Sequence, residues 1–261
     1  MDNLRIATYN IRMETPEDCN DLWRDRKENV MKIIQGYDFD IVGLQEAKES
    51  QLSDLRKMDH FGYFGQGRSN DEGNEYNPIF YKKDKLELME FDTFWLSETL
   101  KFEEKAKRWD ADCPRICTWG YFRIKASGKH VYVFNTHFDH KSENARYYSA
   151  DLLNQKISQK SEDTPVFITG DFNGESTERF YQIITSTWKD AVRTSSHHVG
   201  PKVTCTGQGF NHELSWDKYQ SIDYIFTNKA TKIKKTAVIT DRFNGRYPSD
   251  HFPIYVDTTL I

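Results

Sequence analysis

The stretch RYPSDHFPI, residues 246–254, places Asp250 beside His251, after Pro248 and before the apolar run Phe252–Val256. A carboxylate and an imidazole at the mouth of a buried strand cost free energy to desolvate, and folding does not require them there. A helix cap would be another use for such residues, but the proline and the apolar run that follow argue against a helix. The pair therefore raises the question of a chemical role.

Apolar runs rich in Val, Ile, Tyr and Phe recur along the whole chain and predict strands. The predicted strands are Leu4–Tyr9, Asp40–Leu44, Pro78–Tyr81, Trp119–Ile124, His130–Asn135, Val166–Thr169, Ile222–Thr227, Ile233–Ile239 and Phe252–Val256. Apolar residues at helical spacing predict helices over 23–36, 143–158 and 177–186, with Ser142 as the cap of the second. Strands outnumber helices, which predicts a layered α/β fold in a single domain over residues 1–261.

Polar residues gather just beyond the ends of these strands. They are Asn10, Glu46, His137, Asp139, His140, Asp171, Asn173, Asp250 and His251, together with Asp223, which interrupts an apolar run. Strand ends meet at an edge of a sheet, so residues far apart in sequence can converge there. Oxygen ligands of this kind suit a hard cation such as Mg²⁺, and two histidines add proton chemistry or phosphate contacts.

Each motif alone has a structural explanation, such as a turn or a solvated strand end. The ordered set TYNIR (8–12), LQE (44–46), NTHFDH (135–140), GDFN (170–173), IDYIF (222–226) and SDHFP (249–253) resembles the endonuclease/exonuclease/phosphatase superfamily. That superfamily includes exonuclease III-type nucleases, deoxyribonuclease I and deadenylases. The stretches FWLSE (94–98) and RICTW (115–119) resemble an uncharacterised bacterial group within it.

The resemblance implies a fold and a metal site. The fold is a four-layer αββα sandwich of two mixed β-sheets with outer helices. Glu46 would be the principal Mg²⁺ ligand, with Asn10 beside it and Asp250 as a further acidic group, and Mn²⁺ could substitute for Mg²⁺.

The same resemblance implies the catalytic residues. Asp171 would orient or deprotonate the attacking water, and Asn173 would help to hold that water or the phosphate. His137 would donate a hydrogen bond to the phosphate. His251 would contact the scissile phosphate or transfer a proton, while Asp223 fixes its other ring nitrogen.

The substrate is less well defined by the sequence. Arg115, Asp139 and His140 are candidates for substrate binding. The formal net charge is −4, and no basic cluster flanks the motifs, which disfavours a long duplex. A small or single-stranded phosphodiester, or a soluble sugar or inositol phosphate, fits better.

Four hypotheses follow. The preferred one is a Mg²⁺-dependent phosphodiesterase or nuclease-like hydrolase, and the alternative is a phosphomonoesterase acting on a soluble sugar or inositol phosphate. A catalytically inactive binding module is disfavoured because every matched catalytic position holds a competent residue. A zinc protein built on Cys113, Cys117 and nearby histidines would require tetrahedral S/N coordination.

The amino-acid composition indicates the class of protein and the compartment in which it is expected. Hydrophobic residues make up 37% and charged residues 29% of the 261 residues, which is typical of a globular protein. Four scattered cysteines are expected to be free thiols in a reducing compartment. No signal peptide or membrane span is predicted, so the expectation is a cytoplasmic protein, with a monomer favoured.

Overall fold

The computed structural model describes residues 2–71, 74–99, 109–160, 163–206, 210 and 221–261. Its architecture is two stacked mixed sheets with helices on their outer faces, which confirms the predicted class of fold. Within the described residues, no helix is long and apolar enough to cross a membrane.

The first sheet has seven strands, and its centre is formed by the two ends of the chain. In spatial order the strands are β10 (His198–Val199), β12 (Thr231–Val238), β13 (Ile254–Leu260), β1 (Asn3–Asn10), β2 (Ile41–Gln45), β4 (Ile79–Lys82) and β3 (Phe61–Phe64). β1 runs parallel to β2 and antiparallel to β13.

The second sheet has six strands. In spatial order they are β5 (Leu86–Trp95), β6 (Ile116–Ile124), β7 (His130–His137), β8 (Val166–Asp171), β11 (Asp223–Thr227) and β9 (Lys189–Asp190). β7 and β8 are parallel and end together, because His137 is paired with Asp171. β11 is antiparallel to β8 and begins at the same edge, where Asp223 is paired with Asp171.

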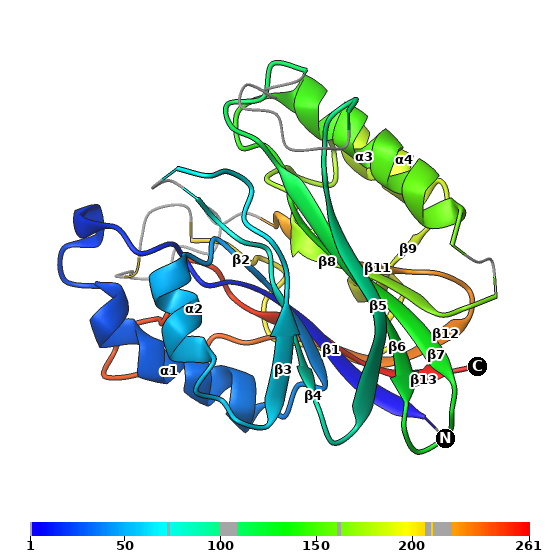
Figure 1. Cartoon of the computed structure of the whole chain (residues 1–261), viewed down its shortest axis with the longest axis horizontal. Helices are drawn as coiled ribbons and strands as arrows, with labels where there is room; N and C mark the ends of the chain where they lie inside the picture. Colours follow the sequence, from blue (N-terminus) through cyan, green and yellow to red (C-terminus); the bar gives the residue numbers. More distant parts are fainter. Residues whose placement is uncertain (1, 72–73, 100–108, 161–162, 207–209, 211–220) are drawn as a thin grey trace.

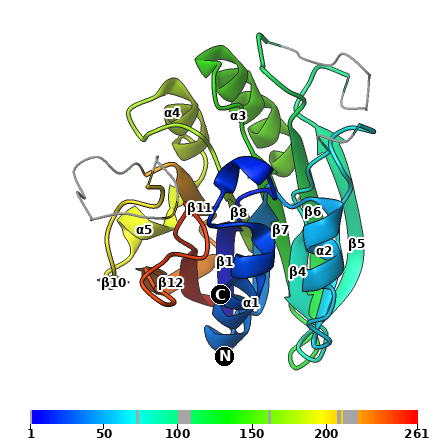
Figure 2. The ribbon, with the colours of Figure 1, turned by 90° about the vertical axis from the view of Figure 1, so that its left-hand side faces the viewer.

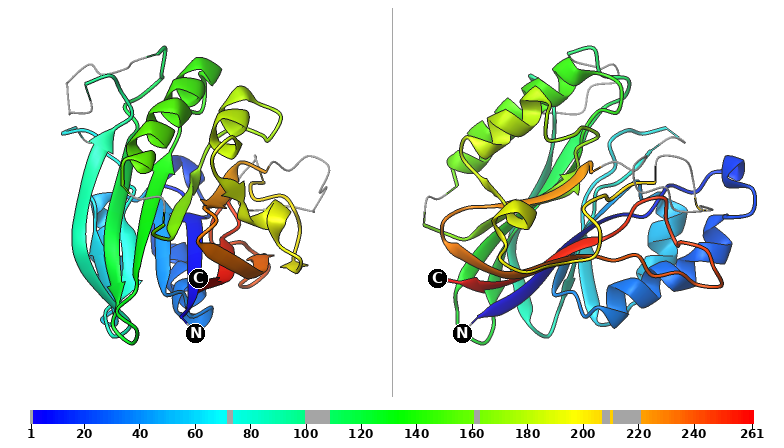
Figure 3. Two further views of the ribbon diagram at one scale, coloured as in Figure 1. Left: turned by 90° about the vertical axis from the view of Figure 1, so that its right-hand side faces the viewer. Right: turned by 180° about the vertical axis from the view of Figure 1, so that it is seen from behind.

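The helices lie in two groups, one on each side of the stacked sheets (Figure 1, Figure 2). α1 (Trp23–Gly36) and α2 (Glu49–Leu55) cover the seven-stranded sheet, whereas α3 (Glu143–Ser158) and α4 (Arg179–Thr185) cover the six-stranded one, as Figure 3 shows from two further sides. The short α5 (Ala191–Thr194) and the 3₁₀ turn η1 (Pro16–Asp18) complete the elements.

The core has three layers because the strands alternate their side chains between two apolar faces. On β1, Ile6 packs between the sheets, whereas Ala7 packs under α1 and α2. A third cluster fills the space beneath α3 and α4, where Phe134 and Phe172 are fully or almost fully buried. Three such layers need both faces of each sheet to be apolar, which explains the nearly continuous apolar runs in the sequence.

The predicted helix over residues 143–158 has the expected bounds and the expected cap. The Ser142 hydroxyl accepts a hydrogen bond from the Ala145 backbone N–H at 3.1 Å. This contact satisfies one of the N–H groups that have no partner inside the helix.

Several predicted boundaries were wrong. Asp223 does not interrupt a strand but is the first residue of β11, β6 begins at Ile116 rather than Trp119, and β13 covers Ile254–Leu260 rather than Phe252–Val256. Asp223 lies where the ladder with β8 ends, and its side chain bonds to His251 beside the other sheet.

The apolar pattern also missed α2, β3 and β5. β5 is the edge strand of its sheet, and its middle is exposed, with Phe91 56% accessible. Charged residues of the LELMEFDTFW segment conceal its strand character, as is common for edge strands.

A polar seam joins the two sheets beneath their common edge. The Gln45 amide donates to the Asn135 side-chain oxygen at 2.6 Å and to the Thr8 hydroxyl at 3.0 Å. The Asn135 amide donates in turn to the Leu44 carbonyl at 2.7 Å. These groups are fully or almost fully buried, so the hydrogen bonds fix how one sheet sits on the other.

Candidate active site

The polar residues predicted from the strand ends converge at one edge, and they come from both sheets. The seven-stranded sheet supplies Asn10 at the end of β1, Glu46 just after β2, and Asp250 and His251 just before β13. The six-stranded sheet supplies His137 at the end of β7, Asp171 at the end of β8, Asn173 just beyond it, and Asp223 at the start of β11.

Asp171 lies at the centre of this group and is 1% exposed. Its carboxylate accepts hydrogen bonds from the Asn10 amide at 2.9 Å and from the Asn173 backbone N–H at 2.9 Å. The Nε2 atoms of His137 and His251 lie 3.5 and 3.7 Å from its Oδ2. Burial, and then the nearby charge of Asp223, raise the pKa of Asp171 to about 7.

His251 and Asp223 form the predicted carboxylate–imidazole pair. His251 Nδ1 lies 2.9 Å from Asp223 Oδ2, and both residues are buried. Burial alone would lower the pKa of His251, but the acidic groups Cys205, Asp223 and Asp171 outweigh it and raise that pKa well above its usual value. The ring is therefore protonated near neutral pH, with Nδ1–H donating to Asp223 and Nε2–H facing Asp171.

Glu46 and Asn10 form a second connected pair. The Asn10 amide nitrogen lies between two carboxylates, 3.0 Å from Glu46 Oε1 and 2.9 Å from Asp171 Oδ2, while its oxygen accepts from the Arg12 N–H. Burial opposes ionisation of Glu46, but this amide, the charge of His251 and the Met13 N–H hold its pKa below the usual value. In this arrangement Asn10 positions the carboxylates, and its role as a metal ligand stays a prediction.

The backbone at Glu46 is held in an uncommon conformation. Its φ is +61°, and Asn173 has φ +51°. Non-glycine residues in this left-handed region cost of order 1 kcal/mol or more, and they persist where the surroundings hold them. Nothing in the sequence pattern signals this conformation.

His137 is neutral, in contrast to His251. Burial and the charges of Arg115 and Arg68 lower its pKa well below the usual value. The Asn173 amide lies 2.8 Å from Nε2, so Nε2 accepts and Nδ1 carries the proton. Among the described residues Nδ1 has no hydrogen-bond partner although it is buried.

The charge balance of the edge fits a divalent cation. Four carboxylates, those of Glu46, Asp171, Asp223 and Asp250, lie close together, and burial and Glu46 raise the pKa of Asp250. Ligand atoms of Glu46, His137 and Asp171 lie within 4.8 Å of one another, and so do those of Asp171, Asp223 and His251. Asp250 belongs to neither group, so its place near a metal stays a prediction. A hard cation would offset the excess negative charge of these oxygens.

A buried arginine anchors the segment that contains Asp250 and His251. Arg26 is 3% exposed, and its guanidinium donates to the Ile11 carbonyl at 2.8 Å and to the Pro248 carbonyl at 2.7 Å. It also donates to the Asp21 carbonyl at 2.7 Å. Arg26 thereby ties the residues after β1 to the residues before His251.

The three predicted substrate-binding residues lie together beside the catalytic residues. Arg115 immediately precedes β6, and Asp139 and His140 follow the end of β7. Arg115 Nη2 lies 3.0 Å from His140 Nδ1, and Arg115 Nε lies 3.8 Å from Asp139 Oδ2.

The zinc hypothesis required Cys113 and Cys117 to share a metal site, but among the described residues they do not belong to one potential metal group. Cys117 is buried in the core beneath α3 and α4, and it belongs to no potential metal group among the described residues. Cys113 instead lies with Asp139 and His140.

Sequence analysis missed a neighbouring ion pair. Arg68 Nη2 lies 2.7 Å from Glu75 Oε1, with their side chains only 14% and 9% exposed. The charge of Arg68 acts on His137, and the charge of Glu46 acts on Glu75. Both residues come from a polar glycine-rich loop, and no spacing in that loop distinguishes them from solvated residues.

Comparisons with known proteins agree with this geometry. The family model described as the endonuclease/exonuclease/phosphatase family matches residues 7–251. The structure of an endonuclease/exonuclease/phosphatase from Bacteroides vulgatus is 34% identical, with a TM-score of 0.92 and each chain covered completely. A mannosyl-6-phosphatase of Bacteroides thetaiotaomicron is 32% identical with a TM-score of 0.90, covering 98% of this chain and 100% of its own.

Among curated relatives, Nocturnin of Drosophila melanogaster is 24% identical over all of this chain. The chain spans only about half of that relative, 47% of its length. The chain belongs to the endonuclease/exonuclease/phosphatase family. Members of this family are hydrolases that act on phosphate esters, and the family generally uses a divalent metal ion.

Proposed function

We propose that this protein is a Mg²⁺-dependent phosphomonoesterase that releases phosphate from a phosphorylated sugar. The observation that carries the hydrolytic part is the meeting of Glu46, Asp171 and the Asp223–His251 pair at one edge. The choice of a sugar phosphate is supported by the mannosyl-6-phosphatase, which is similar over the whole length of both chains.

Asp171 is the proposed general base. Its pKa of about 7 lies near the working pH, where a base is both ionised and able to take a proton. The Asn10 amide and the Asn173 N–H fix its two oxygens, so that the carboxylate is oriented before substrate arrives. The base then removes a proton from the water that attacks phosphorus.

His251 is the proposed donor to the phosphate. It carries a positive charge, and Asp223 holds its ring from behind, so its Nε2–H is aimed into the site. His137 is neutral and has one N–H with no partner in the described part of the chain, which suits a hydrogen bond to a phosphoryl oxygen. Such preorganised donors stabilise the charge of the transition state.

Glu46 would hold the metal ion, with Asn10 and Asp250 beside it. The ion would offset phosphoryl charge when bound, and Mn²⁺ would substitute for Mg²⁺ because both take oxygen ligands. Glu46 suits this role because its pKa is low and it remains ionised at neutral pH.

The test compares two classes of phosphate ester in the presence of Mg²⁺ or Mn²⁺. Hexose 6-phosphates are monoesters, and bis-p-nitrophenyl phosphate is a diester. The proposal expects faster hydrolysis of the monoesters, and faster hydrolysis of the diester would favour the phosphodiesterase predicted first from the sequence. His137→Asn should lower the rate about 100-fold, whereas His130→Asn, at the opposite end of the same strand, should not change it.

A further inference from the structure

Arg115 is a buried guanidinium beside the active site, and part of it lacks a partner. The residue is 6% exposed, and its backbone is fixed because the Leu96 N–H donates to its carbonyl at 2.8 Å. Nη2 contacts His140, whereas Nε and Nη1 are buried with no hydrogen-bond partner in the part of the chain that the structure describes. Buried donors are rarely left unsatisfied in native proteins, so these two point to an acceptor that arrives with the substrate.

The positive charge of Arg115 is already balanced. Asp139 is 0% exposed, and its Oδ2 lies 3.8 Å from Arg115 Nε. Burial opposes ionisation of Asp139, but the N–H groups of Ser142 and Lys141 and the charge of Arg115 keep its pKa low. The pair is therefore neutral overall, and it offers directional donors without surplus charge.

His140 adds a further donor at the rim. A guanidinium can only donate, so the Nδ1 that lies 3.0 Å from Arg115 Nη2 accepts, and the proton is on Nε2. Burial and Arg115 lower the pKa of His140, which keeps the ring neutral. Its side chain is 44% exposed, and its Nε2 lies 3.7 Å from Asp112 Oδ2, beyond hydrogen-bonding distance.

The neighbouring ion pair of Arg68 and Glu75 is balanced in the same way. Its charges act on the catalytic residues His137 and Glu46, so it borders the same centre. In the part of the chain that the structure describes, the wall beside the proposed catalytic residues therefore contains two pairs of opposite charges, Arg115 with Asp139 and Arg68 with Glu75.

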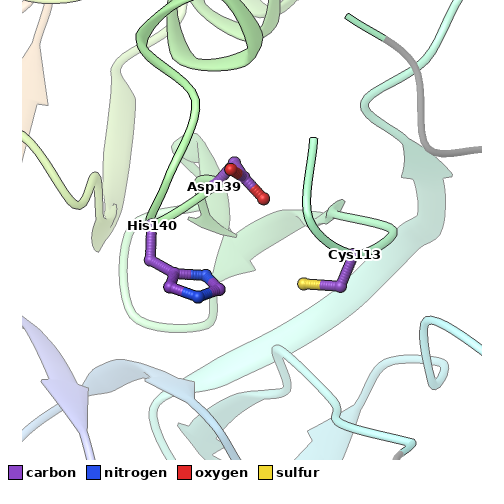
Figure 4. Close-up of side chains that lie close together, drawn as sticks. All are labelled: Cys113, Asp139 and His140. Carbon is purple, nitrogen blue, oxygen red and sulfur yellow. The ribbon is translucent and has the colours of Figure 1, made fainter. Parts of the chain in front are cut away.

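The cluster is poorly suited to a second metal ion. Figure 4 shows Cys113, Asp139 and His140 around one space, and their ligand atoms lie within 4.8 Å of one another. However, the guanidinium of Arg115 already occupies His140 Nδ1, and both oxygens of Asp139 accept backbone N–H groups. Burial also raises the pKa of the Cys113 thiol, which disfavours the thiolate that a metal needs.

We propose that Arg115, supported by Asp139 and His140, determines specificity by binding hydroxyl groups of a neutral, polyhydroxylated leaving group. This inference rests on the proposed function, because the leaving group would be the sugar part of the phosphate ester. Hydroxyl oxygens accept hydrogen bonds without bringing charge, and they therefore match a wall whose charges are already paired. A second phosphate or carboxylate on the substrate would meet Arg115 and Arg68, each of which already has a carboxylate partner.

The test separates recognition of the sugar from recognition of the phosphate. Arg115→Met retains the apolar stem of the side chain but removes the guanidinium with all of its donors. We expect kcat/KM for a hexose 6-phosphate to fall about 100-fold, which corresponds to two lost charge-assisted hydrogen bonds. Hydrolysis of p-nitrophenyl phosphate, whose leaving group has no hydroxyl substituents, should change less than about threefold. Arg123→Met is the matched control, because Arg123 lies on β6 and its side chain is 42% exposed.

A second variant removes the buried negative charge of Asp139, which Arg115→Met leaves without its cation. The double variant Arg115→Met with Asp139→Asn has no unpaired buried carboxylate, and it should show the same selective loss. Its unfolding temperature should fall below that of the wild type, because the new NH₂ group cannot accept from the Asp112 N–H. An equal loss on both substrates, or no loss on the hexose phosphate, would overturn the role of Arg115 alone. A wild-type protein that hydrolyses diesters but no hexose phosphate would overturn the proposed function and this inference with it.

Discussion

Replacing Asp171 by asparagine should stabilise the metal-free protein at alkaline pH while abolishing its activity. The pKa of this carboxyl rises from the ordinary 3.8 to about 7 on folding. The folded state therefore binds the proton more tightly than the unfolded state does. The stability that Asp171 contributes is present at low pH and is lost as the pH rises from about 4 to about 7.

The size of this effect follows from the shift. A pKa difference of about 3 units corresponds to about 4 kcal/mol that the ionised wild type has lost at pH 8. Asparagine avoids this loss, but its NH₂ group would face the Asn10 amide, which now donates to Asp171, and one hydrogen bond worth about 1 kcal/mol disappears. The expected gain for Asp171→Asn is therefore about 3 kcal/mol at pH 8 and less than about 1 kcal/mol at pH 5.

Urea unfolding in the presence of a chelator measures both values. Asp190→Asn is the control, because Asp190 is also buried but caps α5 and accepts from Tyr181. It should lose stability at pH 8. Saturating Mg²⁺ should narrow the difference between wild type and Asp171→Asn, because an ion held at Glu46 favours the ionised carboxylate of Asp171. The reasoning is refuted if metal-free Asp171→Asn is less stable than wild type at pH 8, or if its gain is the same at both pH values.

Three further predictions follow from the site and the seam. Asp223→Asn should lower kcat about 10³-fold with little change in KM, because the His251 ring loses the negative charge that stabilises its protonated form and fixes its orientation. An unchanged kcat in steady-state assays would contradict this. Glu46→Gln should weaken Mg²⁺ binding at least about tenfold in calorimetry, since the ligand charge is lost, and equal affinity would remove Glu46 from the metal site. Gly43→Ala should lower the free energy of unfolding by about 2 kcal/mol in urea, because the added Cβ would lie 2.4 Å from the Asn135 oxygen. A variant as stable as the wild type would show that the polar seam can relax.

Much of the fold could be predicted because its central strands are buried on both faces. The apolar runs at β1, β7 and β8 are close to the observed strands, and the Ser142 cap marks the start of α3 correctly. The edge strand β5 could not be found in this way, since its exposed face carries charges that break the apolar run.

The proposed catalytic residues were predicted from their order along the chain, which a family resemblance supplied. Their protonation states were not accessible from sequence, because they depend on which charges folding brings together. His137 and His251 have opposite pKa shifts: the first lies near Arg115 and Arg68, and the second lies near Asp223 and Asp171. The Arg68–Glu75 pair was missed for the same reason, since neither residue is part of a periodic pattern.

The division of the proposed catalytic residues between two sheets has a practical consequence for engineering. Glu46 and His251 adjoin strands of one sheet, whereas His137 and Asp171 end strands of the other. The rate of turnover therefore depends on how the two sheets are aligned. A substitution at Gln45 or its neighbours that slides the halves by a fraction of an ångström would slow the chemistry before any loss of folding is detectable. Libraries intended to alter substrate preference should therefore spare this inner junction and vary the outer rim.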